Sequence, residues 1–235
     1  MAIDAARTSA GISAITPRRG LAEQGEARDI DALDRVGTGA AYGRRRAIYH
    51  EGDEARHYFK VVSGVVRLCR VTEDGRRQIV AFLVAGEFFG WTVEDHHAYS
   101  AEAVTDVSVM KYPRSRIEEI VRTDPATARR VLGLLTGQLA SAHDHLLLLG
   151  RMTAAERLSA FLLDLIRRCG GAATDAATIE LPMNRRDIAD YLGLTAETVS
   201  RTMSAMKRKG LLSFTGAYSV RLNRCDILER MAMAA

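Results

Sequence analysis

The residues with the most specific chemistry are Glu197, Ser200 and Arg201, the last two standing three and four positions after the first. On a helix they share one face, together with Ala196. An arginine can donate two hydrogen bonds to guanine O6 and N7, and a carboxylate can accept from cytosine N4. A hydroxyl can reach a base edge, and a methyl group can contact thymine. This set predicts a helix that reads base edges. The alternative is a surface helix with one Glu–Arg pair.

Two short helical patterns and a tight turn would position this face. Asn184 can cap the first helix, with Asp187 three residues later in an arrangement like a capping box. Gly193 supplies the turn, and Thr195 can cap the second helix. Segment 181–210 is therefore predicted to be a helix-turn-helix whose second helix enters the DNA major groove. The residues expected to face inward are Ile188, Tyr191, Leu192, Val199, Met203 and Met206.

Positive charge is concentrated in this part of the chain. The 235 residues carry a net charge of +4, whereas eight Lys or Arg against three Asp or Glu lie between Pro182 and Arg224. A basic segment that contains a helix-turn-helix is typical of proteins that bind the phosphate backbone of DNA. The side chains expected to contact phosphates are Arg185, Arg186, Thr195, Thr198, Lys207, Arg208 and Lys209.

The overall composition is that of a soluble globular protein, with 47% apolar and 26% charged residues. Cys69, Cys169 and Cys225 lie far apart and form no CxxC pair, which argues against a structural zinc or cluster site. Three separate cysteines fit a reducing cytoplasm. The sequence has neither the pattern of a signal peptide nor an apolar run of membrane-spanning length.

Short strands are expected in the first half of the chain. Residues 1–38 are predicted to be loose, apart from a short helix at residues 27–33. Between Tyr42 and Tyr112, apolar segments alternate with turn signals such as Glu73-Asp74-Gly75. This spacing predicts an antiparallel β-roll or jelly roll at residues 39–124. The expected strands are 47–50, 58–62, 65–71, 78–83 and 104–112.

A leucine-rich helix is predicted at residues 125–150. Its apolar residues recur at spacings of three and four, the pattern by which two helices pack in a coiled coil. Val131, Leu134 and Leu148 form a second apolar edge for the roll, which leaves the seam for a second copy of the chain. A helix that only covers its own roll is the alternative. The seam consists of Leu132, Leu135, Leu139, Ala142, Leu146 and Leu149.

A last domain is expected at residues 151–235. The long helix should end near Gly150, and Thr153 with Glu156 forms a capping box that opens a new helix. We therefore expect a domain boundary and hinge at residues 150–153. After the helix-turn-helix, segments 211–214 and 218–222 predict a two-stranded wing, with 178–181 as a candidate third strand.

The succession of roll, leucine-rich helix and winged helix-turn-helix, an α+β arrangement, resembles the Crp/Fnr superfamily of bacterial transcription regulators. The likeness covers residues 40–224 and is carried by GEFFGW (86–91), LLLLGRMTAAERLSAFLLDL (146–165) and DIADYLGLTAETVSR (187–201). The pattern E-x-x-S-R of Glu197, Ser200 and Arg201 is similar to that of the Fnr and FixK branches. It implies an inverted repeat of TTGA-type half-sites, TTGA-N6-TCAA, whereas the Crp branch has Gly instead of Ser and reads another half-site.

The roll departs from two ligand-binding branches of that family. Crp-type pockets hold the cyclic phosphate with Arg-Ser, whereas residues 92–101 read TVEDHHAYSA, with Tyr99 before Ser100 and acidic residues nearby. Fnr-type iron–sulfur clusters need N-terminal cysteines, and none precedes Cys69. The resemblance therefore implies a FixK-like homodimeric regulator, an activator, that needs no cofactor. A haem-, ligand- or redox-gated sensor is the alternative. An enzyme on a barrel scaffold would lack a convergent catalytic set.

Histidines offer two further candidate sites. His96 and His97 could ligate haem or a metal, although a solvated loop tip is the favoured interpretation. His143 and His145 lie two residues apart on the long helix and therefore point to different faces, which disfavours a shared metal.

Two other features could react or bind a protein. Cys225 is interpreted as a passive thiol because no helix N-terminus is expected beside it, although Arg224 could lower its pKa. The turn from Thr72 to Arg77 corresponds to a loop that contacts RNA polymerase in relatives, and a plain charged hairpin tip is the alternative.

Overall fold

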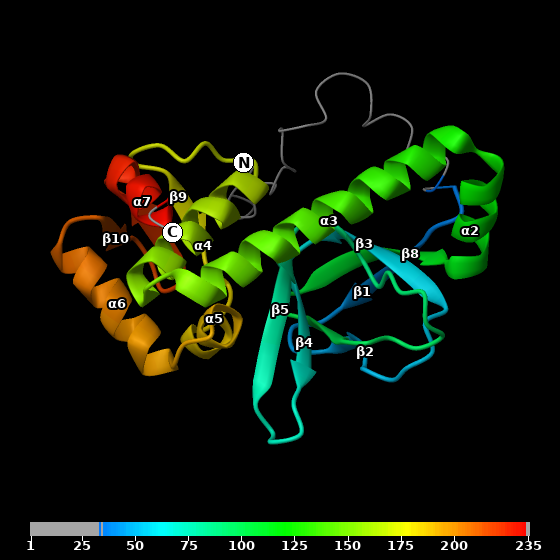
Figure 1. The fold of residues 1–235 in the computed structure, drawn as a ribbon, viewed down its shortest axis with the longest axis horizontal. Helices are drawn as coiled ribbons and strands as arrows, with labels where there is room; N and C mark the ends of the chain where they lie inside the picture. Colours follow the sequence, from blue (N-terminus) through cyan, green and yellow to red (C-terminus); the bar gives the residue numbers. More distant parts are fainter. Residues whose placement is uncertain (1–32, 34, 234–235) are drawn as a thin grey trace, which may run out of the picture.

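The computed structural model describes Leu33 and residues 35–233. A β-roll is followed by one long helix, α3 (Pro125–Arg151), and by a domain of helices with a small sheet (Figure 1). The predicted α+β fold is confirmed. The helix predicted at residues 27–33 lies outside the described residues except for Leu33, which is helical and buried. Within the described ranges, no helix is long and apolar enough to cross a membrane.

The roll consists of two four-stranded antiparallel sheets, ordered β1-β8-β3-β6 and β2-β7-β4-β5. Alternate residues of the strands point inward, so that Val61, Val66 and Val109 are at most 1% exposed. Tyr49, with Phe59 and its aromatic neighbours, fills the space between the sheets. The strands are β1 (Thr38–Tyr42), β2 (Ala47–Tyr49), β3 (His57–Ser63), β4 (Val66–Val71), β5 (Arg77–Leu83), β6 (Phe88–Phe89), β7 (Ser100–Ala103) and β8 (Val107–Pro113).

All five predicted strands are found, although the prediction at 104–112 begins three residues too early. Strand β8 begins at Val107 because Thr105 and Asp106 form a turn, in which the Thr105 hydroxyl accepts from the Val65 amide at 3.0 Å. Strands β1, β6 and β7 were not predicted. They are short, and β1 and β7 consist mainly of small or polar residues, so no apolar alternation marks them.

Helix α2 (Arg114–Thr123) follows the roll, and Asp124 then caps α3 by accepting from two backbone amides. As predicted, one edge of α3 faces its own chain, with Val131 buried and Leu134 packed beside α2. The Gln138 amide also donates to the Phe88 carbonyl at 2.6 Å. The first half of the long helix is thereby held against the roll and α2.

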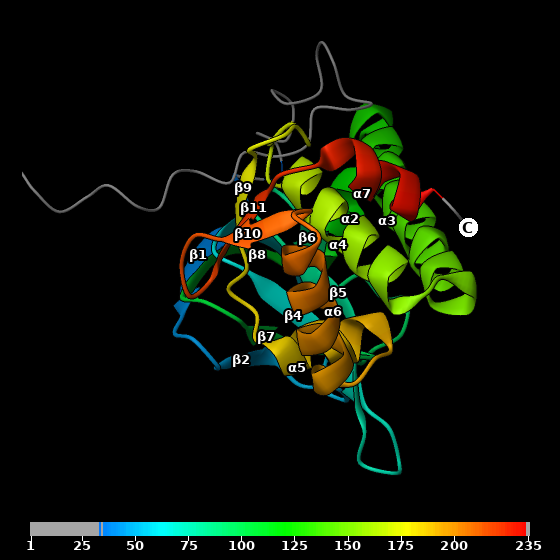
Figure 2. The ribbon, with the colours of Figure 1, turned by 90° about the vertical axis from the view of Figure 1, so that its left-hand side faces the viewer.

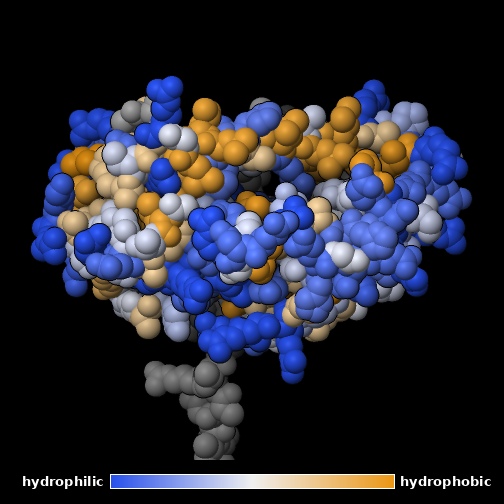
Figure 3. Space-filling model, turned by 60° about the horizontal axis from the view of Figure 1, so that its bottom comes forward, coloured by the Kyte–Doolittle hydropathy of each residue, from blue (hydrophilic) through white to orange (hydrophobic). Residues whose placement is uncertain are grey.

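The other edge of α3 is apolar and exposed. Leu132, Leu139 and Leu146 are 60%, 56% and 64% exposed, and neighbouring Leu147 is 66% exposed. Figure 3 shows apolar side chains gathered along the upper rim of that view, where α3 lies. Leu149 differs from the rest of the predicted seam, since it is half-buried and packs in the core of its own chain. The free apolar edge is therefore one residue shorter than predicted.

The C-terminal domain packs four helices on a three-stranded sheet of order β10-β11-β9. The predicted capping box is confirmed, with the Thr153 amide donating to Glu156 at 2.7 Å and the Glu156 amide donating to the Thr153 hydroxyl. The wing and its third strand are confirmed, whereas the last helix was not predicted. The elements are α4 (Ala154–Arg168), β9 (Thr178–Glu180), α5 (Arg185–Leu192), α6 (Ala196–Arg208), β10 (Leu212–Phe214), β11 (Ser219–Leu222) and α7 (Cys225–Ala232).

The roll and the C-terminal domain share an apolar core. Phe82 of β5 lies 5.3 Å from Tyr191 of α5 and 6.2 Å from Phe161 of α4, measured between ring centres. Arg168 of α4 reaches back to the roll, where its guanidinium pairs with Glu87 at 2.6 Å and contacts the Phe82 carbonyl. Contacts between the roll and the C-terminal domain therefore span the helix break at residues 150–153, where a hinge was predicted.

Candidate nucleic-acid interface

The corner between α5 and α6 is built by local sequence. The Asn184 side chain accepts from the Asp187 amide at 2.8 Å, and the Thr195 hydroxyl accepts from the Thr198 amide at 3.1 Å, so both predicted caps are present. Gly193 ends α5 in the left-handed conformation, with φ of 62°, which glycine adopts without strain. The residues buried on the inner side, as predicted, are Ile188, Leu192, Val199, Met203 and Met206, with Tyr191 half-buried.

The outer side of α6 carries the predicted reading residues. Glu197 and Arg201 form an ion pair of 3.6 Å, and their side chains are 76% and 71% exposed. The exposed Ser200 donates to the Ala196 carbonyl at 2.8 Å. Ala196 is half-buried and packs against the core, so it is less accessible than the other three. Figure 2 shows α6 at the front of the face that also carries the wing.

The predicted phosphate-binding residues fall into two groups. Arg186, Arg208 and Lys209 are exposed, whereas Arg185 is half-buried, with its guanidinium 5.5 Å from the centre of the Phe214 ring. Burial lowers the pKa of Arg185. Lys207 lies over the same ring at 5.5 Å, although it is exposed. Phe214 thus ties two basic side chains of the helix-turn-helix to the wing.

Basic residues of the roll extend this surface and were not predicted to do so. Arg44, Arg45 and Arg46 are exposed in the turn between β1 and β2, and the Arg44 guanidinium lies 6.0 Å from the Tyr218 ring of the wing. The run of three arginines is visible in the sequence. Its place beside the wing depends on the packing of the two domains, which local sequence does not reveal.

Asp187 has a different role from the predicted one. Its carboxylate does not complete a capping box with Asn184 but accepts from Arg67 of β4 at 2.9 Å and from Arg77 of β5 at 2.5 Å. Asp190, one turn later, also pairs with Arg77 at 2.7 Å. The two arginines lie at least 110 residues before Asp187 in the chain. They bind its carboxylate, which is 3% exposed, in place of the backbone amide of Asn184. The first helix of the corner is thereby joined to the roll.

His145 of α3 packs against the same helix. Its ring stacks on Tyr191, with 4.2 Å between ring centres. Among the described residues neither ring nitrogen has a hydrogen-bond partner of normal geometry, and burial lowers the pKa of His145, although the nearby Tyr191 backbone slightly favours the protonated form. Burial also raises the pKa of Tyr191 to about 12, so both rings are neutral near pH 7. His143 is exposed, so the two histidines do point to different faces.

A pH dependence of stability follows from His145. Because its pKa is lower in the folded than in the unfolded chain, the stabilisation by neutral His145 is complete above about pH 6.5 and is lost as the pH falls toward the folded value. One proton can contribute at most about 1.4 kcal/mol per pH unit, and partial solvent access reduces this. We expect His145→Phe to lose less stability than the wild type between pH 7.5 and 5.5 in urea unfolding. His143→Phe is the control, and equal losses in all three proteins would contradict the assignment.

His97 was wrongly predicted to lie at a solvated loop tip. It is 5% exposed and stacks on Tyr49, with 3.7 Å between ring centres, and burial lowers its pKa. The aromatic core of the roll extends to Phe59, whose ring centre lies 6.4 Å from that of His97. Of the two adjacent histidines, His96 is the exposed one. The described residues contain no group of three His, Cys, Asp or Glu side chains that could hold a metal ion.

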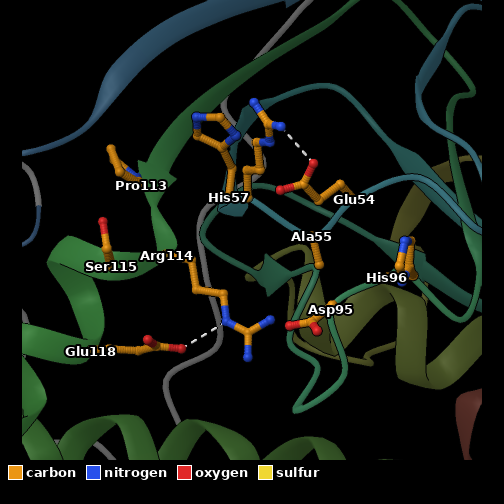
Figure 4. A pocket seen from close by; sticks show the side chains of 10 residues that line it. Glu54, Ala55, His57, Asp95, His96, Pro113, Arg114, Ser115 and Glu118 are labelled. Carbon is orange, nitrogen blue, oxygen red and sulfur yellow. Dashed lines mark hydrogen bonds and ion pairs between the residues drawn. The ribbon is translucent and has the colours of Figure 1, made fainter.

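A shallow pocket of about 730 Å³ lies on the outer surface of the roll, beside the start of α2. Figure 4 shows Arg114 pointing into it beside Asp95. The guanidinium is already engaged, since it pairs with Glu118 at 2.7 Å and donates to the Glu94 carbonyl at 2.6 Å. Arg56 on the same pocket pairs with Glu54 at 2.6 Å. A phosphate would have to displace an existing partner to bind either arginine.

The interpretation of Cys225 needs one correction. Cys225 is the first residue of α7, so a helix N-terminus does lie beside it. Burial and the carboxylate of Asp175 nevertheless raise the pKa of its thiol, while Arg224 pairs with Asp226 instead. Burial also raises the thiol pKa of Cys69 and Cys169. None of these three thiols has the lowered pKa typical of a reactive cysteine.

The hairpin between β4 and β5 protrudes from the roll (Figure 1). At its tip the Thr72 hydroxyl and Arg76 both bind Asp74, which lowers the Asp74 pKa to about 2. Arg77 belongs to the base of the hairpin and pairs with α5, so it is not part of the exposed tip. The accessible surface of this predicted polymerase contact is therefore limited to residues 72–76.

Comparisons with known proteins agree with this architecture. Residues 41–124 match the family described as cyclic nucleotide-binding domain, and residues 156–231 match the Crp-like helix-turn-helix domain. The chain is 41% identical to the nitrogen fixation regulation protein FixK of Azorhizobium caulinodans over 214 residues, which cover 91% of this chain and 86% of the relative. It is 32% identical to the transcriptional activator protein FnrL of Cereibacter sphaeroides over 202 residues, 84% of this chain and 82% of the relative.

A solved structure shows the same fold. FixK2 of Bradyrhizobium japonicum has a TM-score of 0.79 and 42% identity, and the match covers 85% of this chain and 99% of that protein. The relatives are transcription regulators, a non-enzymatic class, and this chain matches the Crp-like helix-turn-helix domain. On its sequence, its two matched domains and its fold, the chain belongs to the Crp/Fnr family of transcription regulators.

Proposed function

We propose that this regulator binds as a homodimer to an inverted repeat of TTGA-type half-sites, without a cyclic nucleotide or an iron–sulfur cluster, and activates transcription in the cytoplasm. The observation that carries the proposal is the two-sided nature of α6. Its inner side is buried, whereas Glu197, Ser200 and Arg201 are exposed on its outer side. These are the residues of the E-x-x-S-R pattern, and they lie on the side of α6 that the described chain leaves exposed.

Each reading residue has a distinct role. Arg201 would donate its two parallel hydrogen bonds to guanine, and Glu197 would accept from the cytosine amino group. Their 3.6 Å ion pair places both side chains next to each other on the exposed side of the helix. Ser200 would reach a base edge or phosphate, and Ala196 would contact a thymine methyl group. The phosphate contacts are assigned to Arg186, Thr195, Thr198, Lys207, Arg208 and Lys209, with Arg185 contributing from its position over Phe214.

The apolar edge of α3 supports dimerisation. Monomeric proteins rarely expose a continuous row of leucines, and a second α3 would cover this one. Leu149 is used within its own chain and leaves the proposed interface, whereas exposed Leu147 joins it. Two recognition helices related by such a dimer axis, about 34 Å apart, would address an inverted repeat. The proposed interface consists of Leu132, Leu135, Leu139, Ala142, Leu146 and Leu147.

Two features support activity without a ligand. The aromatic core of the roll is filled by side chains where Tyr49 meets His97, and Arg114 is engaged by Glu118. A ligand- or redox-gated sensor remains the second candidate because of the match to a cyclic nucleotide-binding domain. Residues 72–76 are the proposed contact for RNA polymerase.

Gel-shift titrations of the purified protein without additives test this function. We expect tight binding to a TTGA palindrome and weak binding to a TGTGA palindrome. Tight binding that appears only after addition of a cyclic nucleotide, haem or a reductant would favour the sensor class instead.

Replacing Arg201 tests the reading face. Arg201→Ala should cost about 1–3 kcal/mol on the TTGA site and relax specificity at one base pair, because a bidentate contact is lost. Lys209→Gln is the control, because losing one phosphate contact should weaken all sequences evenly and reduce the salt dependence by about one ion. Anisotropy titrations against all four base pairs at each half-site position measure both effects. An unchanged base preference in Arg201→Ala would refute the reading model.

A further inference from the structure

A partly buried ion cluster joins the roll to α5, the first helix of the helix-turn-helix. Asp187 and Asp190 of α5 face Arg67 and Arg77 of the roll, and Glu102 of β7 completes the cluster by pairing with Arg67 at 2.5 Å. Side-chain exposures are 3% for Asp187, 14% for Arg67 and 23% for Arg77. All five charges belong to pairs, and the cluster carries one net negative charge.

The geometry of this cluster resists rotation of α5. Arg77 donates through Nε and Nη2 to both aspartates, at 2.8 Å and 2.5 Å, so one guanidinium holds two points one helical turn apart. Arg67 holds Asp187 from the neighbouring strand. Planar, multidentate arginine contacts define orientation as well as distance. Moving α5 relative to the roll would therefore leave the buried carboxylate of Asp187 unpaired, which is costly.

The orientation of α5 is passed directly to α6. The two helices pack through a common core of Ile188, Leu192 and Val199, all fully buried, and are joined by the short turn at Gly193. On the other side, the roll is held to α3 through Gln138. An unbroken series of contacts thus runs from the recognition helix, through the ion cluster, to the helix that carries the proposed dimer seam.

We infer that this ion cluster determines the spacing between half-sites that the dimer accepts, with Arg67, Arg77, Asp187 and Asp190 as positioning residues that do not touch DNA. The inference rests on the proposed dimer and its TTGA half-sites. Changing the spacer by one base pair moves one half-site by about 3.4 Å and rotates it by about 35° around the DNA axis. A rigidly held recognition helix cannot adjust to both the shift and the rotation of the half-site. A recognition helix on a loosely attached domain can.

Affinities for duplexes with spacers of four to eight base pairs test the inference. A duplex with a single TTGA half-site is measured in parallel. The test variant is Arg77→Gln, which removes two ion pairs but leaves Asp187 paired with Arg67. Arg77→Lys keeps the positive charge but lacks the planar guanidinium that donates to both aspartates. Arg76→Gln is the matched control, because it changes the same charge at the adjacent residue, which is 85% exposed and pairs only within the hairpin.

We expect the wild type to prefer six base pairs over five or seven by on the order of tenfold, the effect of misplacing one or more base contacts. In Arg77→Gln this preference should fall by about tenfold, within the range usual for coupling between separate sites. Single half-site binding should be unchanged, Arg77→Lys should be intermediate, and Arg76→Gln should resemble the wild type. A purely structural role would weaken all duplexes together.

Two results would overturn the inference. One is equal binding of the wild type to the duplexes with all five spacers. This result does not depend on whether any variant folds. The other is an Arg77→Gln protein that keeps the spacing preference of the wild type. A wild type that binds none of the TTGA duplexes, whatever their spacer, would instead refute the proposed function, so the two failures can be told apart.

Discussion

Leu139→Glu combined with Leu146→Glu is expected to convert the protein to a monomer and to lower its affinity for the full inverted repeat to that for one half-site. The two leucines are 56% and 64% exposed on the free edge of α3. Paired glutamates would face each other across the proposed seam and repel. A monomer has one recognition helix and cannot bind both half-sites at once. It therefore loses a gain of about 10²- to 10⁴-fold in affinity.

Sedimentation velocity and anisotropy titrations of the same samples measure this result. Val93→Glu is the control, because it places one glutamate at an apolar residue of the roll that is 91% exposed and distant in sequence from α3. Its assembly and its DNA affinity should equal those of the wild type. If the double variant remained dimeric and bound the repeat as tightly as the wild type, the seam would be wrongly assigned.

Arg157→Met is expected to lower the free energy of unfolding by about 3–5 kcal/mol, near the upper end for single substitutions. The Arg157 guanidinium donates to three carbonyls, those of Leu149, Met152 and Leu192, at 2.8–2.9 Å. These carbonyls lie at the ends of α3 and α5, where helices leave their last acceptors unpaired. Methionine keeps the apolar stem but leaves all three acceptors without this donor.

Urea unfolding followed by far-UV circular dichroism measures the loss. Arg151→Met is the matched control, since Arg151 is exposed at the end of α3, and its substitution should change stability by less than about 0.5 kcal/mol. If Arg157→Met were as stable as Arg151→Met, the three hydrogen bonds would not hold the helices together.

The helix-turn-helix could be predicted almost residue by residue because its signals are local. The caps at Asn184 and Thr195 and the turn at Gly193 depend on residues within one or two helical turns. The capping box at Thr153 and the wing turn are equally local. Helix α7 was not predicted although it has an apolar face. It is short, and no capping side chain marks its start after the wing.

The errors at Asp187, His97, Arg185 and Leu149 concern contacts that are distant in the sequence. Asp187 looks like part of a local capping box until strands β4 and β5 bring two arginines to it. His97 appears polar within its own segment, yet Tyr49 provides an aromatic surface from another strand. Arg185 and Leu149 were assigned to DNA and to a partner, whereas the wing and the domain core bury them in part. In each case tertiary packing decides between two roles that the local sequence allows.

Selection of bound sequences from a randomised DNA duplex library is the most direct test of the central claim, that a ligand-free dimer reads an inverted repeat through Glu197, Ser200 and Arg201. The purified protein is used without additives, and Arg201→Ala is selected in parallel. The account predicts that the wild type enriches TTGA and its inverted copy TCAA separated by six base pairs, and that Arg201→Ala loses preference at one position in each half. Enrichment of a single site, of a direct repeat or of no sequence by the wild type would contradict it.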